Sequence, residues 1–297
     1  MIILDRHIKN RISEVWMLIW LSFIIIMPAL ILAGLYFKSS LLLKDKSVTD
    51  LLTSREWKPL SGKFGFYPFI LSSLWVTVLS LVIAGPVCLL SAIHLTQYAK
   101  KAILRVMRPV IDILAGIPSV IYGVWGVIVI VPFIARHSAS MLGKQISGYS
   151  ILAGSIVLSI MIIPFILNIM LEVFKSIPDE LQEASLSLGA SKCQTIKYVL
   201  IKKAFPGIIS AMGLGLSRAF GETIAVLMVV GNVVKIPRGV LQPGYPLPAL
   251  IANNYGEMLS IPMYDSALMF AALILFFIVL VFNLASRILI VRFEKRI

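Results

Sequence analysis

The chain has 297 residues, of which 59% are hydrophobic and only 14% are charged. A soluble protein of this length carries about a quarter charged residues, so the composition excludes an ordinary soluble domain and indicates an integral membrane protein. The 27 basic residues outnumber the 14 acidic ones, but they lie in short segments between apolar runs. Because that distribution is typical of loops that orient a protein in a bilayer, it argues against nucleic acid as a partner.

Long apolar runs, taken in chain order, predict six membrane-spanning helices. A hydrocarbon core of about 30 Å requires about 20 helical residues. Runs of sufficient length cover residues 15–37, 69–93, 113–135, 149–171, 206–234 and 266–286. No segment between them is long enough for a separate soluble domain, so residues 1–297 are expected to form one all-α transmembrane domain.

The basic residues between the runs predict the orientation. If the N-terminus is inside, 16 basic residues fall in inner segments and 10 in outer segments. The inner segments are 1–14, 94–112, 172–205 and 287–297, and the outer segments are 38–68, 136–148 and 235–265. Since basic residues are enriched on the cytoplasmic side, we expect both termini and the 172–205 loop in the cytoplasm, with 38–68 as an external loop.

The 172–205 loop carries signals for two short helices. Ser176 and Asp179 have the spacing of a capping box, with Pro178 in the first turn. The helix is expected to end near Leu188, where Gly189 can adopt the left-handed conformation that ends helices. From the residues alone, the alternative is an interfacial hairpin that lies on the membrane lipid. The chain has no G-x-x-x-x-G-K-[ST] phosphate loop, so we expect no nucleotide hydrolysis, and its isolated His and Cys residues predict no metal site.

The run at 206–234 contains two charges, Arg218 and Glu222. A charge at the centre of a bilayer costs roughly 2.5–3.5 kcal/mol on insertion scales, and the i,i+4 spacing predicts that the two side chains pair on one helix face. Gly213, Ser217 and Gly221 form a neighbouring stripe of small residues suited to close helix contact. The pair is therefore either a structural lock between helices or part of an aqueous path in which Arg218 attracts an anion and Glu222 limits its affinity.

A second stripe of small residues lies in the run at 113–135. Ala115, Ser119 and Gly123 are spaced four apart, which predicts another close-packed helix face. Pro118 within that run is expected to free the carbonyl of Leu114 in mid-helix. The spacing by itself is compatible with ordinary packing of a kinked helix.

Several strings in this order resemble a known family. Glu183, Ala184 and Gly189 match the cytoplasmic "EAA" loop of binding-protein-dependent ABC importer permeases, although Lys202 replaces the usual terminal proline. The strings "LAGIPSVIYGVWG", "LSIMIIPFI" and "LGLSRAFGETIAVLMVVGN" resemble those of phosphate-specific ABC importer permeases, most closely the PstC type.

The resemblance implies a type I, MetI-like permease fold and ATP-driven import of inorganic phosphate without an enzymatic step or a cofactor. It implies three partners: a homologous PstA-type permease, a dimer of cytoplasmic ATP-binding subunits and an external phosphate-binding protein. It also implies that Arg218 and Glu222 act in transport and that Glu183, Ala184 and Gly189 couple to the ATPase. The alternatives are a permease for molybdate, tungstate or sulfate, a channel, and a membrane scaffold or sensor with a purely structural Arg–Glu pair.

Overall fold

The computed structural model describes residues 2–142, 147–256 and 261–294. Within these residues, six helices are long and apolar enough to cross a membrane. They are Ser13–Asp45, Tyr67–Tyr98, Ser119–Ser138, Ile151–Lys175, Lys192–Gly221 and Pro262–Arg292. The prediction of an all-α, six-span chain is confirmed, although the bounds of every span differ from those expected, most of all for the fifth.

The structure divides these spans into shorter elements. The helices are α1 (Ile2–Asp45), α2 (Val48–Thr53), α3 (Tyr67–Ile93), α4 (Lys101–Gly116), α5 (Ser119–Trp125), α6 (Val131–Leu142), α7 (Ile151–Lys175), α8 (Asp179–Ser187), α9 (Lys192–Thr195), α10 (Ile201–Gly221), α11 (Ile224–Val229), α12 (Leu247–Asn254) and α13 (Pro262–Glu294). Short π-helical turns, η2 (His94–Tyr98), η3 (Gly126–Ile130) and η4 (Ile196–Leu200), continue α3, α5 and α9. Strands β1 (Trp57–Lys58) and β2 (Lys63–Phe64) form an antiparallel hairpin around the 3-10 turn η1 (Pro59–Ser61).

The centre of the bundle is α7, which packs against α3 and α10. Small residues allow this close packing. If Gly207 carried a Cβ atom, that atom would lie 2.4 Å from the Val173 side chain, and a Cβ atom added to Gly215 would lie 2.4 Å from the Ile166 side chain. The Ser155 hydroxyl of α7 donates to the carbonyl of Val76 in α3 at 3.3 Å. Because hydrophobic attraction between helices is weak in lipid, such small-residue contacts supply much of the packing.

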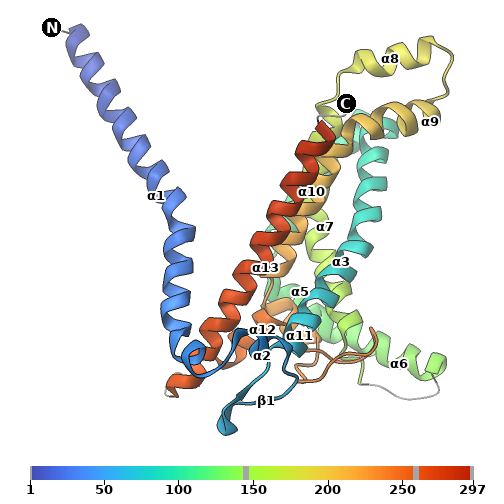
Figure 1. The fold of residues 1–297 in the computed structure, drawn as a ribbon. Coiled ribbons are helices and arrows are strands. Elements are labelled where there is room, and N and C mark those ends of the chain that lie inside the picture. Colours follow the sequence, from blue (N-terminus) through green and yellow to red (C-terminus); the bar gives the residue numbers. More distant parts are fainter. Residues whose placement is uncertain (1, 143–146, 257–260, 295–297) are drawn as a thin grey trace.

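Helix α1 leans away from the bundle at its N-terminal end and approaches α13 only near its C-terminal end (Figure 1). None of the most apolar stretch of α1 is buried by the rest of the chain. At its other end Leu42 is fully buried, and its backbone N–H bonds the hydroxyl of Ser266 at 3.1 Å. Lipid or another subunit therefore covers most of α1 in the membrane.

The segments between spans alternate between the two ends of the bundle, as the sequence predicts. Helices α8 and α9 lie at the same end as both termini, whereas α2, β1 and α6 lie at the opposite end (Figure 1). The predicted 38–68 loop begins inside α1, which continues to Asp45. The rest of it is an ordered cap, because the Trp57 ring packs within 6 Å, centroid to centroid, of the rings of Phe66, Phe69 and Tyr264.

Two of the predicted continuous helices are broken. Helix α4 ends at Gly116, Ile117 is extended, and Pro118 precedes α5 as its N-cap, so Pro118 does not lie in mid-helix as expected. A residue before proline disfavours helical geometry, and proline suits the start of a helix. The Leu114 carbonyl accepts a 2.8 Å hydrogen bond from the Tyr122 hydroxyl across the break. The run expected at 206–234 likewise stops at Gly221, and Glu222 is extended.

The stripe of small residues on α10 is only partly a packing face. A Cβ at Gly213 would lie 2.5 Å from Oγ of Ser286 on α13, and Ser217 donates a 2.7 Å hydrogen bond to Asn283. Gly221 has no atom within 4 Å of its would-be Cβ. The contact between α10 and α13 therefore uses Gly213 and Ser217, whereas Gly221 makes no such contact with the described residues.

This difference gives a matched pair of substitutions on one helix. We expect Gly213→Ala to destabilise the chain by about 1–3 kcal/mol, because the added methyl overpacks the contact with α13. Gly221→Ala is expected to be neutral or slightly stabilising, since alanine favours the helical conformation. Melting temperatures of the detergent-solubilised variants measure the effect, and equal values for the two variants would contradict the assigned contact.

Candidate functional site: an unpaired arginine at a helix break

Arg218 lies in the last turn of α10 and is exposed on the surface of the isolated chain. Its guanidinium carbon is 4.9 Å from the ring centroid of Phe165 on α7. A ring face at this distance attracts a cation and holds a planar guanidinium in place. Helices α10 and α7 thus meet beside this cation.

Glu222 does not pair with Arg218, which corrects the expectation from their spacing. Both residues are described, and no ion pair joins them; Glu222 lies beyond the end of α10 in an extended conformation. Its carboxylate accepts the backbone N–H of Ala225 at 3.2 Å, where it stabilises the start of α11. Among the described side chains no carboxylate lies within ion-pair distance of Arg218, so its charge remains available to an external anion.

The two helix breaks are held together by close packing of α5 against α11. A Cβ at Gly123 would lie 2.6 Å from Sδ of Met228 and 3.2 Å from Cα of Ala225, so Gly123 lies at the contact between the two helices. Ala115 and Ser119 lie on opposite sides of the break between α4 and α5, so they do not form the continuous stripe expected with Gly123.

A row of polar side chains that the sequence analysis missed joins α4 and α7. Asn168 donates a 2.9 Å hydrogen bond to Asp112, and Arg108 donates a 2.7 Å hydrogen bond to Glu172. On α7, Phe165, Asn168 and Glu172 share one face because they are three and four residues apart. The row leads from Arg218 towards the end where α8 lies. A signal was present, since Asn168 places a polar amide within a charge-free predicted span.

The loop at residues 172–205 contains the two short helices that the sequence predicts, but with different caps. Pro178 is the N-cap of α8, and the Ser176 hydroxyl donates to the carbonyl of Val173, so the predicted capping box is wrong. The capping box lies instead at the start of α9, between Ser191 and Gln194. Gly189 between the helices has φ +82°, which confirms the left-handed turn.

Side-chain contacts hold this helix pair against the end of α3. The hydroxyls of Ser185 on α8 and Thr195 on α9 are 2.9 Å apart, and the ammonium of Lys192 lies 4.6 Å from the ring centroid of Tyr98. Glu183 and Ala184 are exposed on α8. Leu188 is 89% exposed in this turn. The described part of the chain therefore supports one side of the pair and leaves the other uncovered.

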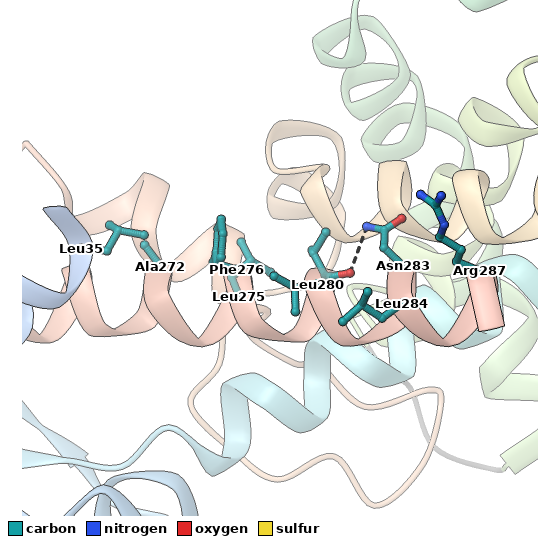
Figure 2. Close-up of a pocket in the computed structure, with 9 residues that line it drawn as sticks. Leu35, Ala272, Leu275, Phe276, Leu280, Asn283, Leu284 and Arg287 are labelled. Carbon is teal, nitrogen blue, oxygen red and sulfur yellow. Dashed lines mark hydrogen bonds between the residues drawn. The ribbon is translucent and has the colours of Figure 1, made fainter. Parts of the chain in front are cut away.

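A groove of about 600 Å³ lies along α13, where Leu35 of α1 also contributes to its wall. Figure 2 shows its row of leucine and phenylalanine side chains, with Asn283 and Arg287 at one end. Asn283 donates a 3.0 Å hydrogen bond to the carbonyl of Val279. Because most of this lining is apolar, the groove suits hydrocarbon chains and not an anion.

Residues 86–297 match the family model described as "Binding-protein-dependent transport system inner membrane component". The chain is 39% identical to a probable ABC transporter permease protein YqgH of Bacillus subtilis over 86% of this chain and 84% of that protein. It is 34% identical to the phosphate transport system permease protein PstC of Xylella fastidiosa, over 82% and 79% of the two chains. A probable PstC of Methanocaldococcus jannaschii is 33% identical over 88% of both chains.

Solved structures share the fold at lower identity. An inward-facing structure of the MetNI methionine ABC transporter superposes with a TM-score of 0.56 at 19% identity, covering 80% of this chain and 99% of that chain. A bacterial alginate ABC transporter in complex with its periplasmic protein gives a TM-score of 0.54 at 16% identity, covering 90% and 92%. The predicted MetI-like permease architecture is confirmed.

Proposed function

The chain belongs to the family of binding-protein-dependent transport system inner membrane components, and we propose that it is the PstC-type permease subunit of an ABC importer for inorganic phosphate. Relatives that carry the name PstC are 31–34% identical to it over most of its length. The observation that carries the proposal is Arg218, a cation without a carboxylate partner among the described side chains, on a face that the chain itself leaves exposed.

In the proposed mechanism, phosphate passes between this chain and a homologous PstA-type permease, close to Arg218. A guanidinium donates paired hydrogen bonds to two oxygens of a tetrahedral oxyanion. A transport site must also release its anion. One arginine held by the Phe165 ring at 4.9 Å supplies attraction without enclosing the ligand. Glu222 supports this site indirectly by capping α11 beside the break.

Energy comes from a dimer of ATP-binding subunits that docks on the uncovered side of α8, at Glu183 and Ala184. The ordered pair of α8 and α9, joined at Gly189, is suited to pass movement of the ATPase into α3 and α10, because a packed element moves as a unit. An external phosphate-binding protein delivers the substrate at the opposite end of the bundle. At the breaks beside Arg218, α4 can change its orientation relative to α5, and α10 can change its orientation relative to α11.

Phosphate uptake by a reconstituted complex, measured with radiolabelled phosphate, tests this function. We expect ATP-dependent uptake that requires the phosphate-binding protein and that excess unlabelled phosphate suppresses. Molybdate, tungstate and sulfate are also tetrahedral oxyanions that a single arginine can accept, so they are the relevant competitors. Transport of one of these anions in place of phosphate would redirect the assignment, and ATP-independent flux would indicate a channel.

The proposed orientation places both termini and α8 in the cytoplasm. Leu60 and Leu188 lie at opposite ends of the bundle and are 91% and 89% exposed. In a background with Cys193, which is exposed, replaced by serine, we expect a membrane-impermeant maleimide to label Leu60→Cys in intact cells. Leu188→Cys should react only after permeabilisation. The opposite pattern would invert the topology.

A further inference from the structure

A second cationic site lies at the outer end of the bundle, away from Arg218. A cavity of about 580 Å³ is lined by Arg55, Lys235 and Arg238, together with Tyr67 and Gln242. Arg55 comes from the segment between α2 and β1, whereas the other two cations come from the loop between α11 and α12. Arg55 and Lys235 line the same cavity. The fold therefore brings together basic side chains that are 180 positions apart in the sequence.

The charges in this cavity are not balanced. None of its lining residues, all of which are described, is acidic, and no described carboxylate lies within ion-pair distance of the three cations. Glu56 adjoins Arg55 in sequence but lies 2.7 Å from the ammonium of Lys63. Lys63 holds the pKa of the Glu56 carboxyl below its usual range, first through that hydrogen bond and then through its charge. Glu56 thus lines a neighbouring cavity that contains both basic and acidic side chains.

The walls of the cavity are ordered. The Gln242 side-chain oxygen accepts the Arg238 backbone N–H at 2.9 Å, and the Gln242 carbonyl accepts the N–H of Ile151 at the start of α7 at 2.9 Å. The guanidinium of Arg55 lies 5.9 Å from the ring centroid of Tyr67. The Gln242 amide also carries an NH₂ group, so the lining includes a further hydrogen-bond donor.

The cavity is also connected to the first site through the chain. Glu222 caps α11 beside Arg218, and α11 has only six residues before the loop that carries Lys235 and Arg238. Six helical residues span roughly 9 Å. We propose that this basic cavity, defined by Arg55, Lys235 and Arg238, is an outer site that holds a small tetrahedral oxyanion before it reaches Arg218. The inference rests on the proposed function, under which the anion is inorganic phosphate.

Protection of Lys235 from acylation tests the outer site. The complex of both permeases and the ATPase, in phosphatidylcholine nanodiscs without the binding protein, is treated with sulfosuccinimidyl acetate, and modified lysines are quantified by mass spectrometry. We expect saturating inorganic phosphate to slow acylation of Lys235 several-fold, relative to potassium chloride of equal ionic strength. Lys58 is the control, because it is exposed at the same end of the molecule and does not line the cavity.

Variants assign the protection to this cavity. The double variant Arg55→Gln/Arg238→Gln should lose the protection, whereas Arg218→Gln should keep it. Equal acylation of Lys235 in phosphate and chloride would overturn the inference, as would protection that appears only when the binding protein is added, which would indicate a docking surface. A complex that imports phosphate without this protection refutes the outer site alone. A complex that does not import phosphate refutes the proposed function.

Discussion

We expect replacement of Arg218 by glutamine to reduce phosphate uptake by about one to two orders of magnitude while the complex still assembles. Hydrogen bonds to charged groups contribute about 1.5–3 kcal/mol, and each 1.4 kcal/mol changes a rate or an affinity tenfold. Glutamine keeps a polar hydrogen-bonding side chain, although a shorter one, and removes the charge. Because the Arg218 side chain is exposed and has no carboxylate partner among the described residues, its neutralisation leaves no buried charge behind. Initial rates of radiolabelled phosphate uptake measure the effect.

The control for this variant is Arg136→Gln. Arg136 is also exposed, but it lies on α6 at the end of the bundle opposite α8, so its neutralisation is expected to leave uptake near the wild-type rate. Co-purification of the ATPase and the partner permease shows whether each variant assembles. Wild-type uptake by the Arg218→Gln complex would remove this residue from the anion path.

We expect replacement of Gly189 by valine to uncouple transport from the ATPase. Gly189 has φ +82° and no neighbouring atom within 4 Å of its would-be Cβ, so the substitution acts through the backbone and not through a clash. A residue with a Cβ pays roughly 1–2 kcal/mol for the left-handed conformation, and a β-branched side chain is especially unsuited to it. The turn is expected to rearrange and to displace α8 from α9. Uptake and ATPase co-purification should both fall sharply.

Gly189→Asn provides the matched variant, since asparagine tolerates the left-handed conformation at the end of a helix. It should retain most of the uptake that valine abolishes. If valine and asparagine give the same high uptake and the same ATPase recovery, then the geometry of this turn does not transmit the movement.

The six spans and their alternation could be predicted from the sequence because length and hydropathy set the cost of crossing a bilayer. The left-handed turn at Gly189 could also be predicted, since glycine adopts that conformation without strain. The breaks at Pro118 and Glu222 could not. Both breaks lie inside runs that are apolar enough to cross a membrane. An apolar pattern does not indicate where another hydrogen bond, such as the one from the Tyr122 hydroxyl to the Leu114 carbonyl, replaces a hydrogen bond of the helix.

The candidate site was therefore predicted in its residues but not in its geometry. Arg218 was identified because a charge in an apolar run is costly, whereas the pairing with Glu222 assumed an unbroken helix. Once the helix ends at Gly221, the i,i+4 relation no longer applies, and Glu222 binds the N-terminus of α11 instead. Phe165, which lies beside Arg218, is 53 positions away in sequence, and periodicity within one run cannot reveal such a contact.

The central claim is that an aqueous path between two permeases passes Arg218. An electron cryo-microscopy structure of the assembled importer with inorganic phosphate tests it most directly. We expect a solvated cavity between the two permeases with anion density beside the guanidinium of Arg218. A guanidinium packed against protein or lipid on every side, with no cavity next to it, would contradict the mechanism.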